Sequence, residues 1–578
     1  MEKNKKSFIK GAAILGIAGL IVKIIGAFYR IPLTNILQPD KTRDGMVFYA
    51  VAYPYYSWLL VISSAGFPTA ISKLVSEKVA IGDKKGATAV FKTAFRLLLG
   101  IGIVTTILLF ACSGLIANLA GVPNARFAIM ALAPALFIVS IMCAYRGYLQ
   151  GMQMMSGTAL SQVTEQVGKL IASYSLAILF VKMYPDKPWL WAMGTLLGIS
   201  ISEVMGLAVI WWIYKRNRRL LPSYKLEDMS ISQKTFKRMC RSLLLIAVPI
   251  TIGASIMPIT GIADTIFIKR LLQARYLMLG FEEKITDVMA DEGFVALRSY
   301  VTPLINMPAV LTLALSMSLV PALAPMTAAR DRRGIRRVGT TGMKLAMLIG
   351  APCAVGLFVL GAPIMAMLYS KVGNSTDTYY ISGFISQILS MKPGQEISIY
   401  ALSGGIMQIS AIGVLFLSLV QTLTGVIQGI GKQNVPVYFL LAGGIIKILS
   451  MILLMKYTSL GILGAAISTV LCYVVAGIGD TVFTLNHANI SLKWFDTFGK
   501  PLLSSLVMGV AVYFVYNIIN KAGHPTLATL GSVVAGVVLY IACLWLLKAF
   551  NRDDLDFMPG SRKIAKIFRV DMKKSNAK

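Results

Sequence analysis

The stretch Gly147–Lys169, GYLQGMQMMSGTALSQVTEQVGK, has a counterpart far downstream in Gly425–Lys447, GVIQGIGKQNVPVYFLLAGGIIK. Both begin with Gly-x-x-Gln-Gly and both end in a lysine. Each stretch closes one apolar segment, makes a short polar turn and opens the next apolar segment. Each second segment then carries a lone lysine, Lys169 or Lys447, which is costly on a lipid-facing helix. The repetition predicts a chain built from two similar halves around a shared site.

The composition of the chain indicates a membrane protein. Of its 578 residues, 56% are hydrophobic and 14% are charged, whereas about a quarter of the residues of a soluble domain are charged. Apolar segments long enough to cross a hydrocarbon layer of about 30 Å recur along the sequence. Because no water in that layer can satisfy open amides, the spanning segments must be helical. We therefore predict an all-α polytopic membrane protein.

Fourteen transmembrane helices are predicted from the apolar segments. They cover residues 8–37, 46–77, 87–118, 124–150, 157–182, 189–214, 242–272, 297–328, 336–368, 398–430, 434–456, 460–485, 496–520 and 526–549. We interpret the first as a retained span rather than a signal peptide. Lys23 interrupts its apolar run, and no convincing small-residue cleavage site follows.

A second pair of motifs keeps the same order along the chain. The stretch Asp83–Gly86, DKKG, precedes the third span, and Asp331–Gly334, DRRG, precedes the ninth. An intramembrane cation follows each motif, Arg96 in the first case and Lys344 in the second. Matching spans are six apart, an even number, so the two halves have the same orientation. This is the arrangement of parallel repeats about an axis along the membrane normal.

The predicted domains follow from these repeats. They are an N-terminal six-helix half at 1–214, a basic cytoplasmic linker at 215–241, a C-terminal six-helix half at 242–485, helices 13 and 14 at 496–550, and a basic cytoplasmic tail at 551–578. The last two helices have no counterpart in the repeat, and we interpret them as an appendage.

The net charge of +31 arises from 56 Lys and Arg against 25 Asp and Glu. With fourteen spans, the basic clusters at 3–10, 84–85, 215–241, 330–337 and 552–578 all fall on one face. This distribution follows the positive-inside rule, so both termini are predicted to be cytoplasmic. The basic loops are thereby explained by topology, and we expect no nucleic-acid partner.

Motifs for catalysis or metal binding are missing from the sequence. The six cysteines lie within or beside apolar spans and lack metal-ligand spacing, and the two histidines lie in loops. Neither a phosphate-binding P-loop nor a nucleophile elbow occurs. We expect neither enzymatic activity nor a metal or cofactor.

Charged side chains inside the spans are the candidate functional residues. A charge at mid-bilayer costs about 2.5 kcal/mol or more, so it should face a wet cavity or an opposite charge. Cations exceed anions in the spans, and a net-positive cavity suits an anionic ligand, with arginine especially suited to phosphate. The candidates for substrate contact are Lys23, Arg30, Arg96, Lys169, Lys344 and Lys447. The candidates for an ion site or structural pairing are Glu165, Glu203, Asp264 and Arg146. We expect Glu165 to pair with Lys169, one helical turn further on.

Three stretches give the chain a resemblance to a known family. They are Lys23–Pro32, which contains Lys23-x-x-Gly26, then Ala65–Glu77, and Tyr145–Gly151. Together with two six-span halves and two extra spans, they resemble the polysaccharide-transporter branch of the multidrug/oligosaccharidyl-lipid/polysaccharide (MOP) exporter superfamily. Within that branch the chain looks like the stage V sporulation protein B and MurJ-type lipid II flippases. The resemblance covers roughly residues 8–550.

The resemblance implies a flippase of the bacterial cytoplasmic membrane. Its substrate would be an undecaprenyl-pyrophosphate-linked sugar, either peptidoglycan lipid II or a related cell-envelope polysaccharide precursor. Alternating access would carry the head group across, and Lys23, Arg30, Arg96 and Lys169 would contact the pyrophosphate. The implied partners are this lipid-linked sugar, membrane lipids and cell-envelope synthesis proteins.

Two other functions stay open at this point. A cation-coupled multidrug antiporter of the same fold should have a net acidic cavity. A non-transporting scaffold for envelope assembly should show no turnover in vesicles.

Overall fold

The computed structural model describes residues 18–19, 21–22, 24–26, 28–38, 44–217, 232–278, 280, 282–369, 399–458, 460–488, 490 and 493–549. All regular secondary structure in these ranges is helical, as expected for a backbone that must satisfy its own amides in lipid. Thirteen helices within them are long and apolar enough to cross a membrane, and a shorter apolar helix covers Ile24–Leu37. The all-α polytopic fold class is therefore confirmed, while the count of fourteen spans stays a prediction.

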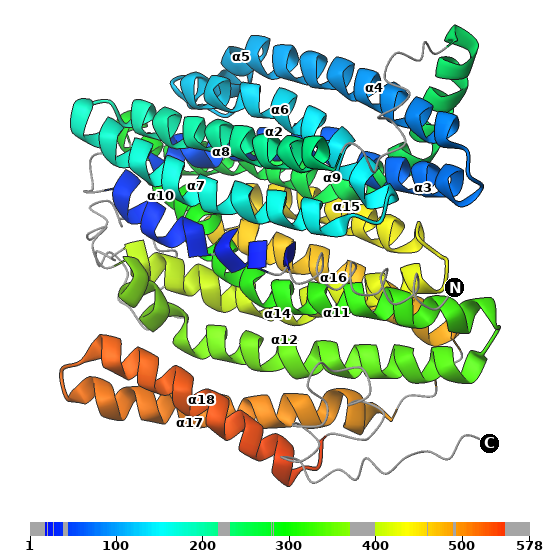
Figure 1. Ribbon diagram of the computed structural model, residues 1–578. Helices are drawn as coiled ribbons and strands as arrows, with labels where there is room; N and C mark the ends of the chain where they lie inside the picture. The colour runs from blue at the N-terminus through cyan, green and yellow to red at the C-terminus, as the bar shows by residue number, and fades with distance from the viewer. Residues whose placement is uncertain are drawn as a thin grey trace. The chain divides into compact units, whose positions relative to one another are not determined.

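The chain forms two compact units, Met1–Arg270 and Leu271–Lys578 (Figure 1). After the helix Ile24–Leu37, the first unit contains α2 (Met46–Ser64), α3 (Phe67–Ala80), α4 (Lys84–Ala111), α5 (Ser113–Leu119), α6 (Ala125–Gly151), α7 (Met155–Met183), α8 (Pro188–Arg216) and most of α9 (Gln233–Met278). The predicted span 46–77 is thus two helices, which meet at Ala65 and Gly66.

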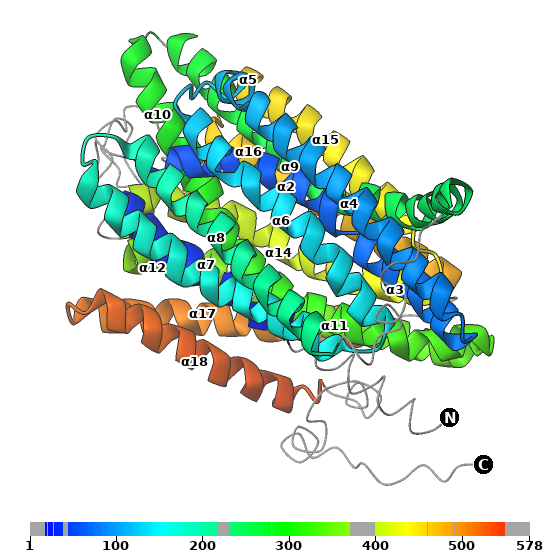
Figure 2. The same cartoon turned by 45° about the horizontal axis from the view of Figure 1, so that its top comes forward.

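The second unit contains α10 (Glu283–Val295), α11 (Thr302–Ala328), α12 (Arg332–Tyr369), α14 (Ile399–Gly429), α15 (Val435–Tyr457), α16 (Ile462–His487), α17 (Lys500–Lys521) and α18 (Pro525–Leu546). Short π-helical segments precede α11 and α17, at Ala296–Val301 and Phe495–Gly499. The last two helices lie side by side and pack against α12 (Figures 1 and 2).

Helix α9, the predicted seventh span, packs mainly within the first unit. Leu243 and Ala247 belong to a buried core with residues of α3, α4 and α6. Near its other end, the Lys269 ammonium donates a hydrogen bond of 2.9 Å to the Gly121 carbonyl. The compact units divide the chain by packing, whereas the predicted repeat divides it by sequence similarity. The repeat boundary at 215–241 therefore stays a prediction.

The first Gly-x-x-Gln-Gly motif forms a tight helix–helix contact. Gly147 and Gly151 lie one turn apart on α6 and face α3. A Cβ at Gly147 would lie 2.8 Å from the Ile71 Cβ, and one at Gly151 would lie 2.7 Å from the Val75 Cβ. Small residues with this spacing let two helix backbones approach closely in a membrane.

The second Gly-x-x-Gln-Gly motif does the same in the other unit. Gly425 and Gly429 lie on α14 and face α11. A Cβ at Gly425 would lie 2.6 Å from the Ser316 carbonyl oxygen, and one at Gly429 would lie 2.8 Å from the Leu323 Cβ. Both Gly-x-x-Gln-Gly motifs are therefore packing motifs with the same local role.

Replacing Gly147 with alanine should destabilise the protein by about 1–3 kcal/mol, the usual effect of an added methyl group in a closely packed interface. The matched control is Gly100→Ala on α4, where a Cβ would meet nothing within 4 Å. The measurement is the thermal midpoint of the purified protein in detergent. Equal midpoints for the two variants would contradict the tight α3–α6 contact.

The Asp-x-x-Gly motifs cap the helices that follow them. The backbone N–H of Gly86 donates to the Asp83 carboxylate at 2.7 Å, and that of Gly334 donates to Asp331 at 3.0 Å. In each case a Cβ on the glycine would overlap the aspartate carboxyl group, so the glycine leaves room for the cap. The hydrogen bond from Gly86, followed by the one from Lys78, lowers the pKa of Asp83.

The Asp83 cap should give a pH-dependent stability. Asp83→Ala should lose about 1 kcal/mol at pH 7, the typical value for an N-cap. Because the pKa of Asp83 is lowered on folding, its charge stabilises the folded state above the ordinary aspartate pKa of about 3.9. That contribution is lost as the pH falls through the folded pKa.

Thermal midpoints between pH 7 and pH 3 test this prediction. The gap between wild type and Asp83→Ala should stay constant down to about pH 5 and narrow below about pH 4. Asp83→Asn keeps a capping acceptor without the charge, so its midpoint should lie between those of the other two proteins. A gap that widens on acidification would contradict the assignment.

Candidate functional site

Two of the predicted cations lie on tyrosine rings in the first unit. The Arg30 guanidinium lies 5.7 Å from the centroid of Tyr49 and 5.0 Å from that of Tyr53. The Lys169 ammonium lies 4.8 Å from the centroid of Tyr29 and 5.4 Å from that of Tyr53. Tyr53 thus contacts both cations. Cation–π contacts contribute about 0.5–2 kcal/mol each, with the upper values at desolvated sites.

The rings come from three helices, and we call Tyr29, Tyr49, Tyr53, Tyr56 and Tyr174 the tyrosine cage. Tyr49, Tyr53 and Tyr56 are spaced i, i+4, i+7 on α2, which places them on one helical face. Neighbouring centroids along this face are 5.6 Å and 6.1 Å apart. Tyr174 of α7 stacks on Tyr29 at 5.5 Å and donates a hydrogen bond of 2.6 Å to its carbonyl. The cage therefore joins the first helix to α2 and α7.

A buried ion pair lies on the neighbouring part of α7. The Arg146 guanidinium, from α6, contacts the Glu165 carboxylate at 2.9 Å and donates to the Ser161 hydroxyl at 2.8 Å. Ser161 in turn donates to the Gly206 carbonyl of α8 at 2.9 Å. The guanidinium thus joins α6 to two residues of α7, and the Ser161 hydroxyl extends the link to α8.

The predicted pair between Glu165 and Lys169 is wrong. Within the described part of the chain, Glu165 is paired with Arg146, and no ion pair joins it to Lys169. The physical reason is that the Lys169 ammonium lies against Tyr29 and Tyr53, on the cage side of α7. Arg146 approaches Glu165 from the adjacent helix and makes one charge-assisted hydrogen bond of 2.9 Å to its carboxylate.

Glu203 of α8 is also part of this site. Its side chain is buried, and the Tyr56 hydroxyl donates to one carboxylate oxygen at 3.4 Å. It interacts electrostatically with Glu165, Arg146 and Lys169. The described charges around the cage are therefore three cations, Arg30, Arg146 and Lys169, and two carboxylates, Glu165 and Glu203.

The remaining predicted residues lie on other helices or outside the described residues. Arg96 is exposed on α4, and Asp264 is buried on α9. Lys344 of α12 and Lys447 of α15 are buried in the second unit, at 3% and 5% exposure. Lys23 lies outside the described residues. Their assignment to substrate contact or pairing stays a prediction.

Sequence reasoning missed two features of these spans. The residues of the tyrosine cage were not among the predicted site residues, although the i, i+4, i+7 spacing on α2 could have shown that three of its rings share a face. Asp480 of α16 is fully buried, and neither carboxylate oxygen has a hydrogen-bond partner among the described residues. A charge inside a predicted span was the signal that could have identified it.

The sequence matches the family described as polysaccharide biosynthesis protein over residues 8–327. The chain belongs to this family. The resemblance to polysaccharide transporters stated from the sequence is therefore confirmed.

Two relatives of the family come from Bacillus subtilis (strain 168). The chain is 24% identical to lipid II flippase MurJ over 518 residues, which cover 88% of each chain. It is 21% identical to stage V sporulation protein B over 557 residues, which cover 96% of this chain and 98% of the relative.

Solved structures share the fold at low identity. The lipid II flippase MurJ in an inward closed conformation matches with a TM-score of 0.58 at 17% identity, covering 93% of this chain and 98% of that one. An inward-facing multidrug resistance MATE transporter of the MOP superfamily gives a TM-score of 0.61 at 15% identity, covering 83% and 98%. The fold is therefore that of MOP-superfamily transporters, and the chain is a multi-pass membrane protein.

Proposed function

We propose that this chain is a flippase for an undecaprenyl-pyrophosphate-linked sugar in a bacterial cytoplasmic membrane, with both termini cytoplasmic. The supporting relatives are named as lipid II flippase and sporulation protein, and they cover nearly the whole chain. The sugar is that of lipid II or of a related cell-envelope precursor. The partners are this lipid-linked anion and the surrounding lipids, together with envelope synthesis proteins that supply or use it.

One observation carries the proposal: Arg30 and Lys169 both make cation–π contacts with the same ring, Tyr53. The carboxylate one turn from Lys169, Glu165, is bound by Arg146 instead. Within the described residues, Lys169 therefore lies against rings and makes no salt bridge, although it interacts electrostatically with Glu203. An anionic group can approach Lys169 without first breaking a salt bridge.

The chemistry of the two cations fits a diphosphate. The Arg30 guanidinium can hold two phosphate oxygens at once, whereas the Lys169 ammonium acts as a point charge. Charge-assisted hydrogen bonds of this kind are roughly twice as strong as neutral ones. Tyrosine hydroxyls at the same site can donate further hydrogen bonds. The cage thus offers a mixed ionic and aromatic surface to a polar head group inside the membrane.

Reconstitution tests the proposal most directly. Purified protein in vesicles receives a defined polyprenyl-diphosphate-linked sugar, and a membrane-impermeant reagent reports how much of it reaches the other leaflet. We expect translocation to depend on the protein and to be absent with a neutral polyprenol-linked sugar. Cation-driven efflux of organic cations without movement of the lipid-linked sugar would favour the antiporter instead.

A further inference from the structure

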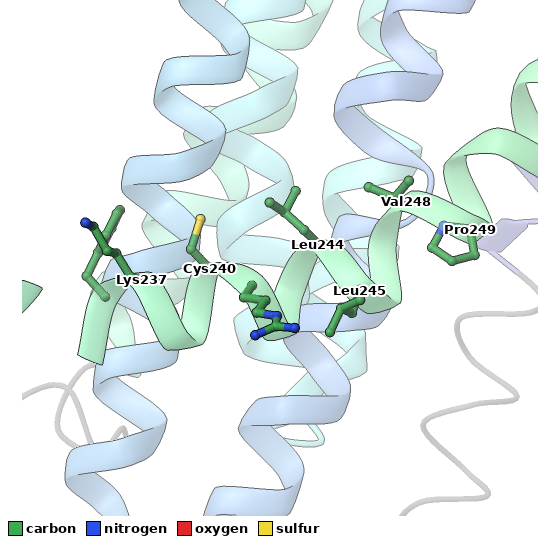
Figure 3. Close-up of a pocket in the computed structure, with 8 residues that line it drawn as sticks. Lys237, Cys240, Leu244, Leu245, Val248 and Pro249 are labelled. Carbon is green, nitrogen blue, oxygen red and sulfur yellow. The ribbon is translucent and has the colours of Figure 1, made fainter. Parts of the chain in front are cut away.

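Helix α9 carries an open groove near its N-terminal end, with a volume of about 560 Å³ (Figure 3). Its lining includes Lys237 and Arg241 at one end and Leu244, Leu245 and Val248 towards the other. These positions recur at intervals of one turn, so they share one face of the helix. The groove ends at Pro249, which has no N–H for the helical ladder.

The groove lies on the outer side of α9. The opposite face carries Leu243 and Ala247, which are buried in the core of the first unit. By contrast, Lys237 and Arg241 are exposed, and Leu245 has 66% of its surface exposed. The groove is therefore accessible without any change in the packing of α9.

The position of the groove relative to the membrane follows from the residues that contact α9. Met239 contacts Thr93 of α4, and Ala247 lies directly against Gly66, where α2 and α3 meet. Gly66 is in the interior of a predicted span, whereas α9 begins at Gln233, within the basic linker 215–241 that is predicted to be cytoplasmic. The cationic end of the groove thus faces the cytoplasmic surface, and its apolar end reaches into the hydrocarbon.

This order of charge and apolar surface matches that of a lipid. Lys237 and Arg241 are one turn apart, about 5–6 Å between their Cβ atoms, a spacing that one phosphate can bridge. Among the described residues, the lining contains no carboxylate. Leu244, Leu245 and Val248 continue the groove with the apolar surface that an acyl chain needs.

We propose that this groove binds one anionic phospholipid of the cytoplasmic leaflet. Its phosphate lies between Lys237 and Arg241, and one acyl chain runs along Leu244, Leu245 and Val248. A single pair of cations on an exposed face suits the single phosphate of phosphatidylglycerol. The site is separate from the tyrosine cage and does not depend on what the cage transports.

The test measures phosphatidylglycerol bound to the purified full-length protein in phosphatidylcholine nanodiscs, by titration and mass spectrometry. Lys237→Gln with Arg241→Gln should weaken saturable binding about thirtyfold, since each cation near the surface contributes about a fivefold factor and the two factors multiply. The matched control is Lys234→Gln with Arg238→Gln. It removes the same charge at the same spacing from exposed positions of α9 outside the groove.

A third variant tests the apolar half of the groove. Leu245→Trp keeps the charge and alters an exposed side chain, so folding should be unaffected, but the indole should fill the groove and block binding. Equal losses in the groove and control variants would show general charge attraction and overturn the proposal. Undiminished binding in the groove variants would overturn it as well. Displacement of phosphatidylglycerol by one equivalent of a lipid-linked diphosphate would make the groove a substrate site instead.

Discussion

Arg30→Ala is expected to reduce flipping of a polyprenyl-diphosphate-linked sugar by about a hundredfold, while the protein remains folded in the membrane. A charge-assisted hydrogen bond contributes about 1.5–3 kcal/mol, and every 1.4 kcal/mol corresponds to a factor of ten. The guanidinium lies over Tyr49 and Tyr53, whose rings would remain in place without it. The loss should therefore fall on substrate binding rather than on packing.

Companion variants make this result specific. Arg30→Lys keeps the charge but loses the paired N–H donors of the guanidinium, so its activity should lie between those of Arg30→Ala and the wild type. Lys169→Ala should show a comparable loss, because its ammonium contacts the same ring, Tyr53. The matched control is Arg126→Ala, which removes an exposed arginine stacked on the Phe127 ring at 4.7 Å. Initial rates in vesicles give the comparison, and wild-type rates for both cage variants would contradict the site.

The second large effect is expected on folding. Arg146→Ala should leave the Glu165 carboxylate buried without its partner, which typically costs about 3–5 kcal/mol. The Arg146 side chain is among the buried ones, and it also holds Ser161. We expect little protein in the membrane fraction and a sharply lowered thermal midpoint. Glu165→Leu alone should have a similar effect, because it leaves the guanidinium unpaired.

The double variant Arg146→Met with Glu165→Leu should recover most of the lost stability. Replacing both members of a buried pair by apolar residues is often neutral or stabilising. If the pair is structural, as we propose, the double variant should also flip the lipid-linked sugar. In a cation-coupled antiporter using Glu165, it would fold but not transport. Recovery of folding without flipping would therefore contradict a purely structural role.

The sequence predicted the helices well because their main determinant is local. Apolar length alone located the long helices, and the Gly-x-x-Gln-Gly motifs marked two real packing contacts, at Gly147 and at Gly425. The break between α2 and α3 was missed because Ala65 and Gly66 do not interrupt the apolar run. The length of an apolar run indicates that a segment can cross the membrane, but it does not show whether that segment is one continuous helix.

The site was harder to predict because its contacts join different helices. The i, i+4 rule favoured a pair between Glu165 and Lys169. In the structure, Glu165 pairs with Arg146 of α6 instead, and Lys169 lies against tyrosine rings. The aromatic residues did not indicate this arrangement. Tyrosines such as Tyr49 and Tyr53 are common in membrane helices, so their presence suggests a cation site only once the helix faces are known. The sequence could identify the charged residues of each helix, but it could not identify the residues on other helices that contact them.

The pairing of Arg146 with Glu165 also bears on how the chain is made. The two residues lie on consecutive helices, α6 ending at Gly151 and α7 beginning at Met155. An arginine at a helix centre raises the apparent cost of insertion by about 2.5–3.5 kcal/mol, and Arg146, five residues before the end of α6, carries a part of that cost. With so short a connection, the translocon can release both helices into the bilayer as one hairpin, with the charges already neutralised. The ion pair would then ease biogenesis before it contributes to the finished fold.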